Sequence, residues 1–155
     1  NLDTLKKVEQ EKIQKILDIY PPFLFVDEIV AIDPGIESTT FLSIKQTDWF
    51  FKSHLISSPT MPGVLLAENM LQTCMLAIYA DHDAGQAKGL IHQFKVTLRE
   101  KITIQDTPLK IKTNAKIQSS KRGLTKATCK IYNQKSKKII AEAEITHFVP
   151  ANIHP

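Results

Sequence analysis

Cysteine and glycine are scarce in this sequence of 155 residues, which holds only two cysteines and five glycines. Two cysteines cannot form a disulfide framework, and Cys74 and Cys129 do not have the spacing of metal ligands. Cys74 lies in an apolar helical pattern, where a buried thiol is expected. A chain of this length can instead bury a sizeable hydrophobic core. We therefore expect one domain over residues 1–155, in a reducing compartment such as the cytoplasm.

The sequence also lacks a long uninterrupted apolar segment. The longest nearly apolar stretch, residues 61–80, contains Glu68, Asn69 and Gln72, which are costly inside a bilayer. The first residues contain no apolar core of a signal peptide. Apolar residues make up 43% of the chain and charged residues 23%, which is typical of a globular protein rather than a disordered one. We expect no membrane span and no membrane partner.

Acidic residues are nearly absent from residues 95–138, which hold 13 lysines and arginines against only Glu100 and Asp106. Lysines here alternate with apolar residues, as in residues 109–112, and such alternation is typical of strands with one solvated face. No aromatic residues interleave with the lysines as a base-stacking surface requires, so nucleic acid is the least favoured partner. Two interpretations stay open: a solvated basic sheet face, or a docking surface for an acidic protein.

Apolar periodicity predicts two helices and a set of strands. A helix over about residues 3–18 ends before Pro21-Pro22, because proline cannot continue the hydrogen-bond ladder. A second helix, over about residues 62–80, is apolar nearly all round and is expected to be buried. Short polar breaks between the later strands predict antiparallel hairpins, so we expect an α+β fold with an antiparallel sheet packed on one buried helix. The predicted strands cover residues 23–32, 37–46, 89–99, 108–118, 124–133 and 138–148.

Polar residues in and before the second helix suggest acid–base chemistry. Glu68 and Gln72 lie one helical turn apart, and His54 follows a group of aromatic residues upstream. A carboxyl group in apolar surroundings keeps its proton and can act as an acid, while a histidine can act as a base. Gly63 opens the helix, where unpaired N–H groups stabilise a developing oxyanion. Each residue alone has an ordinary structural explanation, and their order in the chain is the more specific signal.

That order has a known counterpart. The chain keeps, without a gap, nine residues from His54 to Gly63, five more to Glu68 and four more to Gln72. Together with Met61-Pro62-Gly63-Val64-Leu65, this spacing closely resembles the signature of the bacterial (3R)-3-hydroxyacyl-acyl carrier protein dehydratases, hotdog-fold enzymes of fatty acid synthesis. The resemblance extends upstream to Pro22-Phe23-Leu24-Phe25-Val26-Asp27 and Phe50-Phe51. It departs after the histidine, where Leu55-Ile56-Ser57 replaces the usual Phe-Pro-Gly.

The resemblance implies a hotdog fold, in which the antiparallel sheet wraps around the central helix, and the removal of water from a 3-hydroxyacyl thioester. His54 would remove the C2 proton, Glu68 would protonate the departing hydroxyl, and the Gly63 N–H would bind the thioester carbonyl. No metal and no cofactor is implied beyond the phosphopantetheine of the acyl carrier protein. The implied substrate-binding residues are Gln72, Thr60, Met61, Val64, Phe50 and Phe51, with Gln72 orienting Glu68 and the Thr60 carbonyl orienting His54.

The resemblance also implies partners. Family members place the histidine and the glutamate of one site on opposite subunits, so we expect a homodimer, or a hexamer built as a trimer of dimers. Acyl carrier protein is acidic, and the residues expected to contact it are Arg99, Lys101, Lys121 and Arg122. Two alternatives stay open at this point: a hotdog acyl thioesterase, and a non-catalytic partner subunit that binds acyl thioesters.

Overall fold

The computed structural model describes residues 2–80 and 89–149, with side chains from Glu9 onward. The prediction of one domain over residues 1–155 stays a prediction, because residues 1, 81–88 and 150–155 lie outside the described part. The elements, in chain order, are α1 (Leu2–Leu17), β1 (Glu28–Asp33), β2 (Glu37–Ile44), the 3-10 helix η1 (Trp49–Lys52), α2 (Gly63–Tyr79), β3 (Leu90–Leu98), the 3-10 helix η2 (Ile104–Asp106), β4 (Leu109–Lys121), β5 (Leu124–Asn133) and β6 (Ile139–Phe148).

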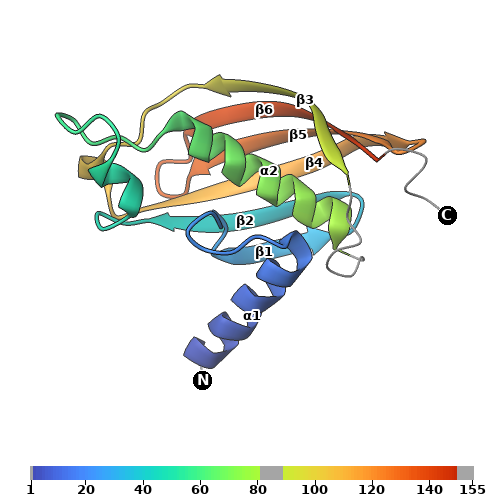
Figure 1. The fold of residues 1–155 in the computed structure, drawn as a ribbon, viewed down its shortest axis with the longest axis horizontal. Coiled ribbons are helices and arrows are strands. Elements are labelled where there is room, and N and C mark those ends of the chain that lie inside the picture. Colours follow the sequence, from blue (N-terminus) through green and yellow to red (C-terminus); the bar gives the residue numbers. More distant parts are fainter. Residues whose placement is uncertain (1, 81–88, 150–155) are drawn as a thin grey trace.

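The six strands form one antiparallel sheet in the order β1-β2-β4-β5-β6-β3. The sheet curves around α2, which crosses one face of it, while α1 lies beyond the β1 edge (Figure 1). Strands β4, β5 and β6 follow one another through short turns, which explains their neighbouring antiparallel places. The predicted α+β class and the antiparallel sheet around a central helix are confirmed.

Helix α2 is the centre of the hydrophobic core because its apolar residues occupy nearly every face. Leu66, Met70 and Cys74 are almost fully buried and pack against inward-facing residues of β4, β5 and β6. The predicted burial of Cys74 is confirmed. Among the described residues, no helix is both long and apolar enough to cross a membrane.

The prediction of a strand over residues 23–32 is only partly right. The strand β1 begins at Glu28, and of residues 24–27 before it Asp27 donates its N–H to the Phe41 carbonyl of β2. The peptide groups of Phe25 are instead bonded by two side chains of α2, with Gln72 Oε1 accepting from the Phe25 N–H at 2.7 Å and Asn69 Nδ2 donating to the Phe25 carbonyl at 2.7 Å. Side-chain amides therefore take the place of a neighbouring strand here.

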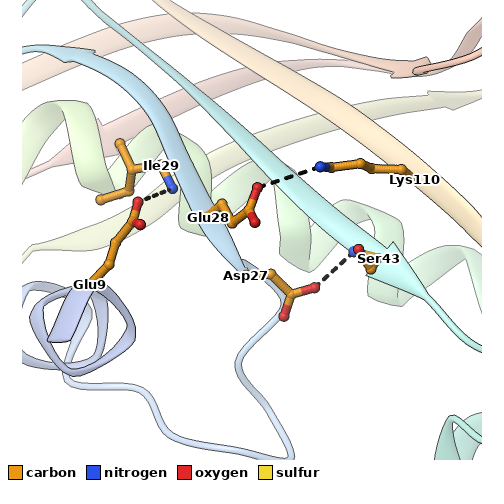
Figure 2. A network of polar contacts seen from close by, with 6 residues as sticks. All are labelled: Glu9, Asp27, Glu28, Ile29, Ser43 and Lys110. Atoms are coloured by element: carbon orange, nitrogen blue, oxygen red, sulfur yellow. Dashed lines mark hydrogen bonds and ion pairs between the residues drawn. The ribbon is translucent and has the colours of Figure 1, made fainter. Parts of the chain in front are cut away.

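The end of this segment and the edge strand β1 are fixed by carboxylates (Figure 2). Asp27 Oδ2 accepts from the Ser43 N–H of β2 at 2.8 Å, and Glu9 of α1 accepts from the Ile29 N–H at 2.9 Å. The Glu9 contact satisfies a backbone donor at an edge that has no further strand. Glu28 forms an ion pair with Lys110 of β4, whose ammonium group also lies over the Phe41 ring.

The lysine-rich strands have the predicted solvated face. In β4 and β5, Lys110, Lys116, Lys126 and Lys130 are exposed, while the residues that alternate with them point toward α2. Glu142 and Glu144 of β6 lie directly across from Lys130 and Thr128, so the face carries both signs of charge. Within one chain the alternation is that of strands with one exposed face, and a docking surface for an acidic protein stays a prediction.

Candidate active site

The site begins at the N-terminus of α2, where Pro62 precedes the first helical residue, Gly63. The first N–H groups of a helix have no partner within it and carry partial positive charge. A Cβ atom on residue 63 would clash with Cδ1 of Leu98, at the end of β3. The Leu98 side chain therefore packs against the open side of Gly63, and β3 and α2 meet at this point.

Glu68 lies about one and a half turns into α2, on the same side as Gln72. Gln72 Nε2 donates to Glu68 Oε1 at 3.1 Å. Burial raises the pKa of the Glu68 carboxyl above its ordinary value, and the hydrogen bond from Gln72 partly offsets this rise. The geometry thus gives a half-buried carboxyl group with a greater tendency to keep its proton than an exposed glutamate has.

His54 lies in the loop between η1 and α2, and its ring is oriented by that loop. His54 Nδ1 lies 2.9 Å from the carbonyl oxygen of Thr60. The loop is in turn attached to the segment before η2, because the Met61 N–H donates to the Ile102 carbonyl and the Ile104 N–H donates to the Pro59 carbonyl. A carbonyl oxygen only accepts, so Nδ1 carries the hydrogen and Nε2 is left as the free basic nitrogen.

The other predicted substrate-binding residues divide into buried and exposed ones. Phe50, Phe51 and Met61 are nearly fully buried in the core of the single chain, and Thr60 is 7% exposed. Val64 is 74% exposed on the first turn of α2. Within one chain, then, the two phenylalanines belong to the hydrophobic core, whereas Val64 is exposed on the first turn of α2.

Within one chain the described residues include no hydrogen bond or ion pair between His54 and Glu68. His54 instead contacts the Thr60 carbonyl, and Glu68 contacts the Gln72 amide. Each of the two predicted residues therefore has its own orienting group within one chain.

The four cations predicted to dock a carrier protein do not form one patch. Leu98 pairs with Ala141 at one end of the sheet, and Leu124 pairs with Phe148 at the other. Arg99 and Lys101 follow Leu98, near the start of α2, whereas Lys121 and Arg122 form the β4–β5 turn beside Leu124. Arg99 is also engaged by Glu142 of β6, its Nε lying 2.7 Å from Oε2. Neighbouring positions in sequence were a poor guide to a shared surface.

Asn69 is the residue that sequence reasoning missed. It follows Glu68 directly, is fully buried, and bonds both the Phe25 carbonyl and the Thr113 hydroxyl of β4. A signal was available, because a polar side chain in a helix that is apolar nearly all round needs buried partners. Among residues 2–80 and 89–149, no group of three or more His, Cys, Asp or Glu side chains is arranged to hold a metal ion.

The arrangement of the antiparallel sheet around α2 is shared with solved structures of one fold. The chain resembles the zebra fish thioesterase superfamily member 2 with a TM-score of 0.67 and 18% identity, over 97% of this chain and 99% of that one. It resembles the dehydratase heterocomplex ApeI:P of Xenorhabdus doucetiae with a TM-score of 0.69 and 10% identity, over 89% of this chain and 90% of that one. At these identities the likeness shows the fold alone, which is the hotdog fold.

Sequence comparison then gives the family. Residues 19–144 match the FabA-like domain, so the chain belongs to the FabA-like family. It is 32% identical to the 3-hydroxyacyl-[acyl-carrier-protein] dehydratase FabZ of Ruminiclostridium cellulolyticum, over 87% of this chain and 92% of the relative. It is 29% identical to the enzyme of the same name in Clostridium tetani, over 88% and 96%. A 69-residue stretch is 42% identical to the one in Anaeromyxobacter and spans 44% of each chain. The resemblance to the dehydratase family is confirmed.

Proposed function

We propose that this protein is a 3-hydroxyacyl-acyl carrier protein dehydratase, a hydro-lyase that converts a (3R)-3-hydroxyacyl thioester into the trans-2-enoyl thioester. One structural observation supports it above the others: a half-buried carboxyl group, Glu68, is fixed by Gln72 near the N-terminus of a buried helix. Membership of the FabA-like family, and relatives that carry the name FabZ dehydratase, support the same function.

In the proposed reaction, Nε2 of His54 removes a proton from C2 of the acyl chain. The electrons of that C–H bond form the C2–C3 double bond as the C3–O bond breaks, and Glu68 gives its proton to the departing oxygen, so that water leaves. The Gly63 N–H binds the thioester carbonyl, where negative charge increases in the transition state. Thr60 holds His54 and Gln72 holds Glu68, which fixes both groups for the transfer. Met61 and Val64 flank the thioester, and Phe50 and Phe51 shape the acyl pocket behind them.

A complete site requires two chains. His54 of one subunit would face Glu68 of the other in a homodimer, which agrees with the lack of a hydrogen bond or ion pair between them among the described residues of one chain. Strand β3 is an edge of the sheet and meets α2 at Gly63, and Leu98 and Val64 are 51% and 74% exposed there. A second copy that pairs along β3 would cover these apolar side chains. The trimer of dimers is the larger assembly that we propose to test.

Acyl carrier protein is the proposed donor of the substrate. Arg99 and Lys101 lie near the start of α2, where a phosphopantetheine arm would have to enter, and a basic rim there favours an acidic carrier. Lys121 and Arg122 lie at the opposite end of the sheet and would contact a carrier only on another subunit or in another orientation. The reaction as written needs no metal and no cofactor besides that arm. The two buried free cysteines favour a reducing compartment, and we propose the cytoplasm.

The decisive experiment supplies 3-hydroxyacyl and enoyl thioesters of several chain lengths, on carrier protein, to the purified protein. Reversible formation of the conjugated enoyl thioester, followed by its ultraviolet absorbance, is the expected result. Release of free thiol without dehydration would instead identify a thioesterase, which is an activity of other hotdog proteins. Binding of the acyl carrier without either reaction would identify a non-catalytic partner subunit.

A further inference from the structure

The backbone N–H and the backbone carbonyl of Phe25 are each bonded by a side chain of α2. Its N–H donates to Gln72 Oε1, and its carbonyl accepts from Asn69 Nδ2, both at 2.7 Å. Gln72 Nε2 also donates to the Phe23 carbonyl at 2.8 Å. Both amide side chains are buried, Gln72 at 1% exposure and Asn69 at 0%. A buried side-chain amide has little freedom to rotate when its hydrogen bonds go to backbone groups or to side chains that are themselves fixed.

These contacts determine which side of the Gln72 amide carries the oxygen and which carries the nitrogen. A backbone N–H can only donate, so it must meet the amide oxygen, and a backbone carbonyl can only accept, so it must meet the amide nitrogen. Phe25 and Phe23 impose both conditions at once. Gln72 therefore has only its NH₂ group to offer Glu68, and that group donates to Oε1. Gln72 thus occupies Oε1 of Glu68, and Oε2 is the oxygen left to carry the transferable proton when the carboxyl group is protonated.

The orientation of Asn69 is determined in the same way. The Phe25 carbonyl only accepts, so it must meet Nδ2, and Oδ1 then accepts the hydroxyl hydrogen of Thr113 of β4 at 2.6 Å. Thr113 is completely buried, so its hydroxyl has no water to bond instead. A continuous chain of contacts thus runs from β4 through Asn69, Phe25 and Gln72 to Glu68.

We propose that Asn69 and Thr113 are positioning residues for the dehydration: through Phe25 they hold Gln72 in the orientation that occupies Oε1 of Glu68 and leaves Oε2 to carry the transferable proton. This inference rests on the proposed function, because it assigns a role to the acid of that reaction. The residues act at a distance from the substrate, so they should affect the chemical step rather than the binding of the acyl carrier.

The test uses a buried threonine on each of two neighbouring strands. Thr113→Val removes the hydroxyl that anchors Asn69 Oδ1 and keeps the side-chain shape. Thr40→Val is the matched control, since Thr40 is the cross-strand partner of Thr113, is equally buried, and bonds Thr73 rather than Asn69 or Phe25. Thr113→Ser restores the hydroxyl. Two readouts are measured on the full-length protein: kcat and KM for a 3-hydroxyacyl carrier thioester, and hydrogen exchange of the Phe25 amide.

For Thr113→Val we expect kcat to fall about 10-fold with KM changed less than about 2-fold, since a misplaced acid weakens only the transition state. Exchange at the Phe25 amide should become faster, and Thr113→Ser should return both quantities toward the parent values. Thr40→Val should leave kcat and Phe25 exchange near the parent values even if it lowers the melting temperature.

Equal losses of kcat in Thr113→Val and Thr40→Val would overturn the positioning role and indicate a general packing effect. Unchanged Phe25 exchange in Thr113→Val would overturn it as well, because the chain of contacts would then not depend on Thr113. A parent protein that forms no enoyl thioester would instead refute the proposed function. The exchange measurement needs no activity, so that failure is distinguishable from a failure of the hydrogen-bond chain.

Discussion

His54 donates its Nδ1 hydrogen to the carbonyl oxygen of Thr60, at a distance of 2.9 Å. This contact fixes the tautomer of the ring and leaves Nε2 to accept a proton. A backbone hydrogen bond joins the same two residues, from the Thr60 N–H to the His54 carbonyl, so the loop from 54 to 60 closes on itself. The proposed base is therefore held by the fold of its own loop and needs no partner carboxylate to orient it.

Replacement of His54 by alanine tests the proposed base. We expect kcat to fall about 100- to 10,000-fold, the usual contribution of general acid–base catalysis. The melting temperature should change little, because the side chain lies in a loop and makes its one hydrogen bond to that loop. Ser58→Ala in the same exposed loop is the control and should retain full activity. Parent-like turnover by His54→Ala would remove His54 from the mechanism.

Glu68→Gln tests the proposed acid with almost no change of shape. Glutamine at position 68 can still accept from Gln72 Nε2 through its own oxygen, so the fold should be preserved. It cannot donate a proton to a departing hydroxyl, and we expect a loss of about 100- to 10,000-fold in kcat. Glu144→Gln, on the exposed face of β6, is the matched control. The assignment is wrong if both variants turn over at the same rate.

The pH dependence of the reaction should reflect the burial of Glu68. Burial raises its pKa, so the protonated, active form persists to higher pH than it would in an exposed glutamate, whose pKa is about 4.5. Activity should be lost as the pH rises through the raised pKa of Glu68. Titration of the Glu68 carboxyl carbon by NMR, in protein labelled at glutamate, measures that pKa directly. A midpoint at or below 4.5 would contradict the expected effect of burial.

The Gly63→Ala variant tests whether access to the Gly63 N–H, rather than the packing around residue 63, determines activity. The new Cβ would meet Leu98 Cδ1, the end of a flexible and half-exposed side chain that can rotate away. We therefore expect a change in the free energy of unfolding of no more than about 1 kcal/mol. Activity should fall much more, because the methyl group lies where the thioester carbonyl would approach the N–H. The double variant Gly63→Ala/Leu98→Ala removes the clash, and full recovery in it would indicate that only packing had been disturbed.

The parts of the fold that depend on local pattern could be predicted from the sequence. Pro62-Gly63 and the apolar run after it predicted a helix over residues 62–80, and the structure has it at Gly63–Tyr79. Alternating residues predicted the strand over 124–133, which β5 matches. The contact between Glu68 and Gln72 could also be predicted from local pattern, since residues four apart in a helix are neighbours.

The remaining features depend on contacts between distant residues, which a local pattern does not contain. Phe25 lies in a run that reads as a strand, yet its hydrogen bonds go to side chains more than 40 positions away. Arg99 and Arg122 belong to one basic stretch, yet β3 and the β4–β5 turn carry them to opposite ends of the sheet. The expectation that His54 and Glu68 of one site come from different subunits stays a prediction and depends on the family resemblance alone.

A buried pair outside the proposed site gives a further dependence on pH. His147 of β6 is 2% exposed, and its Nε2 lies 2.5 Å from the Tyr79 hydroxyl at the end of α2. Its Nδ1 has no hydrogen-bond partner among the described residues. A Cβ atom on Gly89 would clash with the same ring, so the backbone there lies directly against the pair.

Burial lowers the pKa of His147 below its ordinary value of 6.5, because the charged ring would lose its hydration. The unfolded chain then binds the proton more tightly than the folded chain. The contribution of neutral His147 to the free energy of unfolding is therefore present above about pH 6.5 and is lost as the pH falls through the lowered pKa.

His147→Gln keeps an acceptor for Tyr79 and cannot titrate. We expect it to be about 1–2 kcal/mol less stable at pH 7, yet to lose less stability between pH 7 and pH 5, as measured by urea unfolding. Parallel losses in parent and variant would show that another group is responsible, and His92→Gln, on the exposed side of β3, controls for the removal of a solvated histidine.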